Sequence, residues 1–173
     1  MVPVATYRCE VDVQRMSENQ QEVGPGGSVY TNNRVALTRF ATALVGPSDA
    51  ADVVSDTMVS LLRSGTLDTA ANPVALMYRA VLNTSRSHHR SVYRRRARER
   101  KFAETIVVHD PELRPDVVEA VVGLSPRQRA CVYLTYWEDL TPRAVAERLG
   151  IGEGTVKRYL ARARAKLREV LDE

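Results

Sequence analysis

The sequence of 173 residues has no long hydrophobic run, little cysteine and few aromatic residues. No apolar stretch approaches the roughly 18–20 residues that cross a bilayer, and charged residues stand where a signal peptide would need an apolar segment. We therefore expect a cytoplasmic protein without membrane insertion. Two cysteines, Cys9 and Cys131, exclude a disulfide-stapled scaffold and indicate reduced thiols. The 7 Tyr, 2 Phe and 1 Trp, with only short β-branched runs, favour helices over sheets.

Residue sets that bind metals or nucleotides are also missing. A helix would direct the adjacent His88 and His89 about 100° apart, and the remaining histidine is His109. Neither cysteine belongs to a CxxC pair, so we expect no metal site. Glycine stands at every second position from Gly150 to Gly154, but a phosphate-binding loop of this kind needs a preceding strand, and a predicted helix precedes it here. We therefore expect no cofactor.

Three aspartates, Asp49, Asp52 and Asp56, could be taken for a carboxylate group that performs acid–base chemistry. Acidic residues near a helix start complement the positive end of the helix dipole, and this simpler explanation needs no chemistry. The sequence also offers no nucleophile–base pair, so we predict no catalytic residues and no enzyme.

The charges are distributed unevenly. The formal net charge is only +4, yet residues 73–101 carry 9 basic and 1 acidic side chains, and residues 141–173 carry 8 and 5. Residues 1–72 carry 5 basic and 8 acidic side chains, and residues 102–140 carry 3 and 7. Two basic blocks separated by an acidic one indicate a polyanionic partner, either nucleic acid or an anionic membrane surface. The apolar face beside the first block is too narrow for membrane anchoring, which favours nucleic acid.

The first half of the chain predicts a tail and three helices. Residues 1–29 are polar, end in a glycine-rich stretch and show no sustained period, so we predict a flexible tail. A helix over about 31–45 follows, and a second, capped by Ser48, ends at Ser64-Gly65. Asn72-Pro73 starts the third, which ends as a basic rod. The single apolar stripe of the first helix is Leu37, Phe40, Ala41 and Leu44.

The second half predicts a linker and four helices. Residues 102–115 break the periodicity and contain two prolines, which is typical of a linker. A short helix over 116–122 follows, and Ser125-Pro126 with Gln128 forms a capping box that opens the next helix. No strand pattern occurs in the sequence. We therefore predict an all-α protein of two small helical domains joined by a linker.

The segment 141–168 carries the clearest functional pattern. A short helix capped by Thr141, a glycine-containing turn and a longer helix are typical of a helix-turn-helix. Basic residues beside the apolar stripe of the longer helix can reach guanine edges or phosphates in a major groove. An ordinary helical hairpin with a solvated basic face is the simpler alternative. The predicted DNA-binding residues are Arg143, Thr155, Lys157, Arg158 and Arg162. The predicted core aromatics nearby are Tyr133, Tyr136 and Trp137.

Short motifs follow one another in the C-terminal half: 124–129, 140–141, 146–151, 154–157 and 162–164. They resemble the −35-reading domain of bacterial RNA polymerase sigma factors of the sigma-70 family, most closely the extracytoplasmic-function group. Response regulators of the LuxR type carry a similar domain, so this half does not decide alone.

Two motifs in the N-terminal half decide between these families. The segment from Asp49 to Asp56 resembles the polymerase-binding helix of the sigma factors, and the segment from Leu76 to Asn83 with the following arginines resembles their −10-recognition helix. The matches cover about residues 31–170 in the expected order. The resemblance implies a domain similar to sigma region 2 over residues 30–101 and one similar to sigma region 4 over 116–173.

The resemblance implies a transcription initiation factor that binds core RNA polymerase and directs it to promoters with −10 and −35 elements. It implies core polymerase and promoter DNA as partners; an anti-sigma factor commonly holds such proteins, although no residue here identifies one. The residues implied in polymerase binding are Asp52, Ser55 and Asp56. The residues implied in binding the −10 element are Tyr78, Arg79, Asn83, Arg86, Arg90 and Arg94.

The sequence departs from the family pattern at three positions. Ala51 and Ser55 stand where the family usually has Glu and Gln, both in the polymerase-docking helix. Leu76 stands where the family usually has Trp, so Tyr78 or Asn83 would have to stack on a flipped base or hydrogen-bond to it. The alternative function is a helix-turn-helix regulator that binds an operator without acting as a polymerase subunit.

Overall fold

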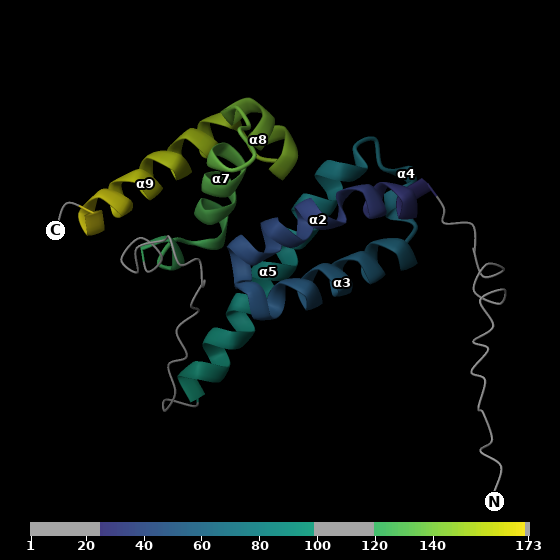
Figure 1. Cartoon of the computed structure of the whole chain (residues 1–173), viewed down its shortest axis with the longest axis horizontal. Coiled ribbons are helices and arrows are strands. Elements are labelled where there is room, and N and C mark those ends of the chain that lie inside the picture. Colours follow the sequence, from purple (N-terminus) through teal and green to yellow (C-terminus); the bar gives the residue numbers. More distant parts are fainter. Residues whose placement is uncertain (1–24, 99–119, 172–173) are drawn as a thin grey trace, which may run out of the picture.

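The computed structural model describes residues 25–98 and 120–171, and every regular element within these ranges is a helix (Figure 1). The all-α prediction is therefore confirmed. The helices are α2 (Pro25–Val45), α3 (Pro47–Arg63), α4 (Thr66–Thr69), α5 (Pro73–Arg98), α7 (Pro126–Tyr136), α8 (Pro142–Leu149) and α9 (Glu153–Leu171). The predicted linker, 102–115, lies outside the described residues. Of the short helix predicted over 116–122, residues 120–122 are described and are helical.

Helices α2, α3 and α5 pack on one another and form the N-terminal unit (Figure 1). The apolar stripe predicted for α2 is confirmed, since all four of its side chains are fully buried. Their helical spacing places them on one side of α2, where they meet the buried faces of α3 and α5. Tilted aromatic packing adds to this core, because the Phe40 and Tyr78 ring centroids are 4.9 Å apart.

The prediction of a tail over residues 1–29 is wrong for its last five residues, because α2 already includes Pro25. The glycine-rich composition suggested a loop, but a distant carboxylate fixes this turn: the Gly26 amide donates to Asp68 Oδ1 over 2.8 Å. Val29 and Tyr30 then pack against the core. A contact across 42 residues of sequence leaves no local signal.

The start predicted for α3, with Ser48 as the cap, is also wrong by two residues. The helix begins at Pro47 with Gly46 as its N-cap residue, and no side chain caps it. Gly46 has a φ of 90°, a backbone conformation that glycine adopts without strain. The predicted end is confirmed, since α3 stops at Arg63 and Gly65 adopts the left-handed conformation. The segment between α3 and Asn72 contains the four-residue helix α4.

Three cap predictions are confirmed by hydrogen bonds. Asn72 Oδ1 accepts from the Ala75 amide at 2.9 Å and so starts α5. Ser125 and Gln128 form both bonds of the capping box that starts α7. Thr141 Oγ1 accepts from the Ala144 amide at the start of α8. Because each cap satisfies backbone amides left free at a helix start, these three helix starts could be predicted from the sequence.

Helices α7, α8 and α9 form the C-terminal unit, and α8 and α9 make the predicted helix-turn-helix. Gly150 ends α8 in the left-handed conformation, with a φ of 64°. Val145 on α8 and Val156 on α9 are fully buried and lie in the core. A residue with a Cβ would be strained at this turn, which explains the glycine.

The two units also pack against each other. Helices α2 and α5 of the N-terminal unit contact α7, and α5 contacts α8. Figure 1 shows α7 and α8 standing over one side of the α2–α5 bundle. The buried apolar residues of both units therefore form a single cluster.

Two of the three aromatic residues predicted for the core are exposed. Tyr136 and Trp137 are 51% and 64% exposed, whereas Tyr133 is half-buried. Helix α7 ends at Tyr136, and its buried side is instead the one carrying Ala130, Cys131 and Leu134. Trp137 stacks on the Tyr133 ring, with centroids 6.2 Å apart, at the edge of the core.

Candidate nucleic-acid interface

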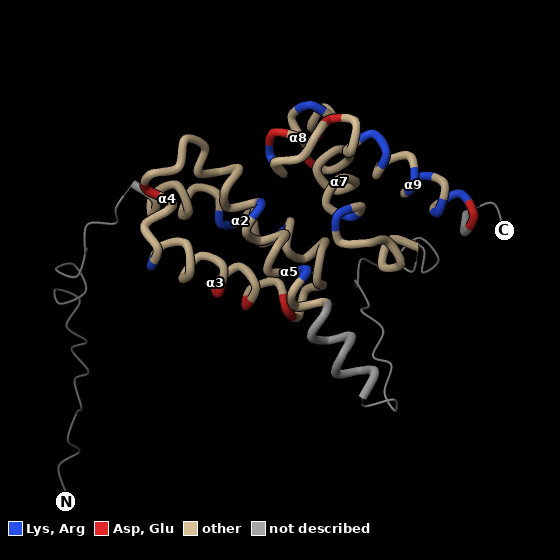
Figure 2. Tube along the Cα trace, turned by 180° about the vertical axis from the view of Figure 1, so that it is seen from behind, with Lys and Arg blue, Asp and Glu red and all other residues tan. Residues whose placement is uncertain are grey.

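The recognition helix α9 separates its apolar and basic residues cleanly. Val156, Leu160 and Ala163 are buried, while Lys157, Arg158 and Arg162 are exposed. The helical period of 3.6 residues puts these two sets on opposite faces. Figure 2 shows the basic positions following one another along α9. Of the remaining residues predicted to bind DNA, Arg143 on α8 is exposed and Thr155 is half-buried.

Two of these basic side chains form ion pairs with acidic side chains on their own helix. Lys157 Nζ lies 2.7 Å from Glu153 Oε1, and Arg143 Nε lies 3.2 Å from Glu147 Oε1, both one helical turn away. The hydrogen bond and charge of Lys157 lower the pKa of Glu153. Within the described part of the chain, Arg158 and Arg162 make no ion pair. These two arginines are therefore the cations most available to a DNA phosphate or base.

The residues of α5 that were predicted to bind the −10 element differ in their exposure to solvent. Arg79 and Asn83 are exposed and Arg86 is half-buried, all on the described part of the helix. The side chains of Arg90 and Arg94 lie outside the described residues. The N-terminal half of α5 therefore offers two exposed polar side chains beside a buried stripe.

The prediction that Tyr78 contacts the −10 element is wrong in this structure, because the side chain is 1% exposed. Its position continues the buried stripe of α5, with Val81, Leu82 and Ser85 three, four and seven residues on. The Arg148 guanidinium carbon lies 4.8 Å from the Tyr78 ring centroid and covers it from the C-terminal unit. Burial raises the pKa of Tyr78. No base can stack on this ring while α8 stays in place.

Arg79 approaches the turn of the helix-turn-helix. A Cβ placed on Gly150 would lie 2.8 Å from Arg79 Cδ, closer than real Cβ contacts allow. Gly150 therefore serves twice, since it permits the left-handed turn and admits the Arg79 side chain. Helix α5 therefore meets the helix-turn-helix at its turn and along α8.

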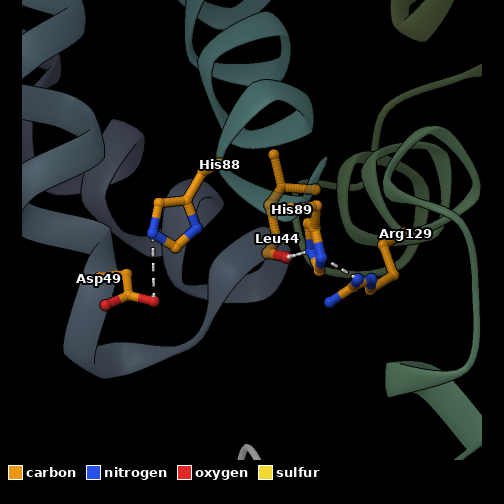
Figure 3. Close-up of polar contacts among 5 residues, drawn as sticks. All are labelled: Leu44, Asp49, His88, His89 and Arg129. Atoms are coloured by element: carbon orange, nitrogen blue, oxygen red, sulfur yellow. Dashed lines mark hydrogen bonds and ion pairs between the residues drawn. The ribbon is translucent and has the colours of Figure 1, made fainter. Parts of the chain in front are cut away.

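The adjacent histidines of α5 point to different partners, as Figure 3 shows. His88 Nε2 lies 3.5 Å from Asp49 Oδ2 on α3. His89 Nε2 lies 2.9 Å from the Leu44 carbonyl oxygen and 2.9 Å from Arg129 Nη2 on α7. Among the described residues, no three His, Cys, Asp or Glu side chains are grouped as a metal site would require.

Arg129 is a buried cation between the two units. It is 5% exposed, its Nε has no hydrogen-bond partner within the described chain, and burial lowers its pKa. Neither Arg129 nor Arg148 was recognised from the sequence as a contact between units. Their partners His89 and Tyr78 are 40 and 70 residues away in the chain, and no local pattern signals such pairs.

An acidic face lies on α3, on the other side of the N-terminal unit (Figure 2). Asp52, Ser55 and Asp56 are exposed, whereas Val53, Val54, Thr57 and Met58 are buried. The three residues predicted to bind polymerase therefore share one solvent-facing side of a helix. Ala51 is exposed beside them.

In the parts of the chain that the structure describes, no helix is both long and apolar enough to cross a membrane.

Comparison with known sequences supports both units. The family described as Sigma-70, region 4 matches residues 115–167. RNA polymerase sigma-E factor of Streptomyces coelicolor is 30% identical over 141 residues, covering 79% of this chain and 80% of that protein. The protein of the same name from Streptomyces avermitilis is 31% identical over 144 residues, covering 79% of each. That from Streptomyces antibioticus is 43% identical over 56 residues, or 32% of this chain and 31% of that protein.

Two solved structures share the arrangement of helices. The sigma factor RpoE of Bartonella quintana, in complex with the anti-sigma factor NepR, superposes with a TM-score of 0.65 at 24% identity, over 84% of this chain and 95% of that one. CnrH, in complex with the cytosolic domain of CnrY, gives a TM-score of 0.58 at 26% identity, over 92% and 94%.

The long matches run through both units, so an operator-binding regulator that shares only the helix-turn-helix is not favoured. Sigma factors are polymerase-associated, non-enzymatic initiation factors, in keeping with the separate acidic and basic faces described above. At 30% identity or more over about four fifths of two relatives, this chain belongs to the RNA polymerase sigma factors of the sigma-70 family, in the extracytoplasmic-function group.

Proposed function

We propose that this sigma factor divides promoter recognition between its two units, with α9 reading the −35 element and α5 holding the −10 strand. The observation that carries the proposal is the amphipathic construction of α9, which buries one face in the C-terminal unit and leaves a row of cations in solvent. A recognition helix needs this arrangement, because one face must fix its angle while the other enters the groove.

At the −35 element, two arginines of α9 that make no ion pair with any described residue are the principal readers. Arg158 and Arg162 are free to donate to guanine edges or phosphates. Lys157 and Arg143 must first leave Glu153 and Glu147, but solvent screens exposed pairs of this kind and makes them weak, so a phosphate can replace the carboxylate. Thr155 would contact a phosphate or a thymine methyl.

At the −10 element, α5 holds the single strand through polar and charged groups. Arg79, Asn83 and Arg86 lie on the described part of the helix, and Arg90 and Arg94 continue it. Asn83 is the candidate to hydrogen-bond with a flipped base, since Tyr78 is buried. The arginines would hold the backbone through charge, which makes binding dependent on salt.

Core polymerase would dock on the acidic face of α3. Asp52, Ser55 and Asp56 project from it together, and α3 packs against α2, α4 and α5 of its own unit. The protein would act in the cytoplasm without a cofactor and without chemistry of its own. One structural neighbour was solved with the anti-sigma factor NepR and the other with the cytosolic domain of CnrY, and on this ground we also propose an anti-sigma factor as a partner of this chain.

Reconstitution with core polymerase tests the proposed function. The complete chain should form a holoenzyme and produce run-off transcripts from promoters bearing −10 and −35 elements. Changing Asp52 and Asp56 together to Asn should weaken the complex with polymerase. Failure of the wild-type chain to bind core polymerase would contradict the proposal, and tight operator binding without polymerase would favour a plain regulator.

A further inference from the structure

A hydrogen bond joins the end of α7 to α9, away from the cations assigned above to the groove. The Arg164 Nε donates to the Tyr136 hydroxyl oxygen over 3.0 Å. We propose that Tyr136 and Arg164 together form a phosphate-binding site that holds one strand of the DNA backbone beside the −35 element. This inference rests on the proposed function, because it requires α9 to lie in the major groove at that element.

Both side chains of the pair are open to solvent. Tyr136 is 51% exposed, and Arg164 is exposed on α9. The buried side of α7 is the one that carries Ala130, Cys131 and Leu134, so core packing does not explain a tyrosine at position 136. The hydroxyl and the guanidinium are therefore within reach of a ligand outside the protein.

The chemistry of this pair fits an anion. The Tyr136 hydroxyl is uncharged and accepts from Arg164 without neutralising it, whereas a carboxylate in its place would cancel the charge. The hydroxyl keeps its own proton to donate, and the two Nη groups of Arg164 can donate to another acceptor. No described residue forms an ion pair with Arg164. One positive charge with several donors on one side is the arrangement that binds a phosphate group well.

Lys166, two residues further along α9, shows a different use of a cation. Its Nζ donates to the Gly123 carbonyl oxygen over 2.6 Å, and a Cβ on Gly123 would lie 2.8 Å from the same Nζ. The lysine thus binds the backbone of its own chain near the start of α7. Arg164 is bound to a neutral side chain instead, which leaves its charge available to DNA.

The helical spacing places Arg164 on a flank of α9. It follows Lys157 by seven residues, so the two lie on one side of the helix about 10 Å apart. It follows Arg158 by six residues, which turns it about 120° away from that arginine. A helix seated in a major groove about 12 Å wide has a phosphate backbone along each flank. Arg158 would then face base edges, while Lys157 and Arg164 would follow the phosphates of one strand.

A phosphate contact at this position would orient the C-terminal unit without reading sequence. Because Tyr136 belongs to α7 and Arg164 to α9, one phosphate would be held by two helices that meet at an angle (Figure 1). The contact would fix how α9 enters the groove. Loss of the site should therefore weaken binding without changing which −35 sequence is preferred.

Single methylphosphonate substitutions test the site in the reconstituted holoenzyme. Each promoter duplex would carry one uncharged phosphate analogue, moved one position at a time along both strands of the −35 element. The wild-type holoenzyme should lose affinity at several positions. Arg164→Ala should abolish the loss at one of them and keep the others, because only that phosphate has already lost its partner. An unchanged pattern of losses for Arg164→Ala would overturn the proposal.

Tyr136→Phe tests the part played by the hydroxyl. It keeps the ring and the charge of Arg164 but removes the hydrogen bond, so it should reduce the loss at the same phosphate without abolishing it. The matched control is Tyr133→Phe, which removes a hydroxyl that donates to Glu138 Oε1 over 3.1 Å, about one turn earlier on α7. The control should leave every position unchanged. A Tyr136→Phe pattern identical to wild type would contradict a site built from both residues.

A salt titration separates a phosphate contact from a bond that only joins α7 to α9. Arg164→Ala should lower the slope of log affinity against log salt concentration by about 0.9, and Arg164→Lys, which keeps the charge, should restore most of it. Arg127→Ala removes an exposed cation at the other end of α7 and should leave the slope unchanged. Lower thermal stability of Arg164→Ala with an unchanged slope would show a structural role alone and refute the site.

The two proposals fail in different ways. A wild-type holoenzyme whose promoter binding does not depend on the −35 element would refute the proposed function. Binding that depends on the −35 element, with the same methylphosphonate pattern for wild type and Arg164→Ala, would refute the phosphate site and leave the proposed function standing.

Discussion

The two helices assigned to DNA differ in what their second face meets. Helix α9 buries Val156 and Leu160 within its own unit and leaves its cations in solvent. Helix α5 buries one stripe in the N-terminal unit but also contacts α7 and α8 of the other unit, so part of its predicted DNA surface is covered. The same local pattern, an amphipathic helix with basic residues, therefore leaves the predicted DNA-binding surface of α9 open to solvent and that of α5 partly covered by the other unit.

The largest expected effect tests whether Tyr78 belongs to the core. Tyr78→Ala should lower the free energy of unfolding by about 3–5 kcal/mol, because it leaves a cavity beside Phe40 and Val81. Asn83→Ala, on the exposed side of the same helix, should change it by less than about 0.5 kcal/mol. Urea unfolding of both variants provides the measurement. Equal, small effects would return Tyr78 to the DNA-binding surface.

The next effect concerns the open face of α9. Arg158→Ala should weaken holoenzyme binding to the −35 element by about 1–3 kcal/mol if the side chain contacts a base edge. Competition between promoters that differ only at −35 would measure the change. The matched control is Arg127→Ala, which removes an exposed cation outside the recognition helix. Unchanged selectivity between the two promoters would discard the groove assignment.

The buried Cys131 in the C-terminal unit predicts a loss of stability at alkaline pH, similar in size to the effect of Arg158→Ala. Burial raises the pKa of the Cys131 thiol from 9.0 to about 12. The unfolded chain loses this proton near pH 9.0, so the thiol's stabilising contribution is full below that value and is lost as the pH rises to about 12. Wild-type stability should therefore fall with pH more steeply than that of Cys131→Ala, by up to about 1.4 kcal/mol per pH unit.

Chemical denaturation of the wild type and of Cys131→Ala between pH 7 and 10 checks this prediction. The Ala variant retains the buried Tyr78 and the half-buried Tyr133, whose pKa values are also raised by burial, and so controls for their titration. Parallel pH profiles would show that solvent reaches the thiol in the folded chain.

The smallest effect should come from the cations that already have partners. Lys157→Ala should reduce −35 binding less than Arg158→Ala does, because part of the Lys157 interaction with DNA replaces its existing pair with Glu153. Glu153→Gln should increase binding a few-fold by removing the competing carboxylate. Titrations at two salt concentrations would show both changes. A larger loss for Lys157→Ala than for Arg158→Ala would reverse their assigned order.

Local features of this fold were readable from the sequence. The capping residues Asn72, Ser125 and Thr141 each form the predicted hydrogen bond, because a helix start must satisfy its own amides within three residues. The periodicity of α9 correctly separated buried from exposed positions for the same local reason.

Features that depend on contacts between residues far apart in the chain could not be predicted from the sequence. Pro25 is helical because Asp68 anchors Gly26, and Tyr78 is buried partly because Arg148 lies above it. Tyr136 and Trp137 follow the spacing of a buried face, but α7 ends before the core can cover them. In each case a partner far along the chain, or the end of a helix, decides the outcome.

Reconstituted transcription with each protein variant on each promoter variant tests the central claim most directly. Run-off by wild type, Arg158→Ala and Asn83→Ala holoenzymes would be measured on an intact promoter and on promoters with a scrambled −35 or −10 element. The account predicts that Arg158→Ala adds no further loss once the −35 element is scrambled, and that Asn83→Ala adds none once the −10 element is scrambled. Losses that are independent of which element is scrambled would contradict the division of promoter recognition between α9 and α5.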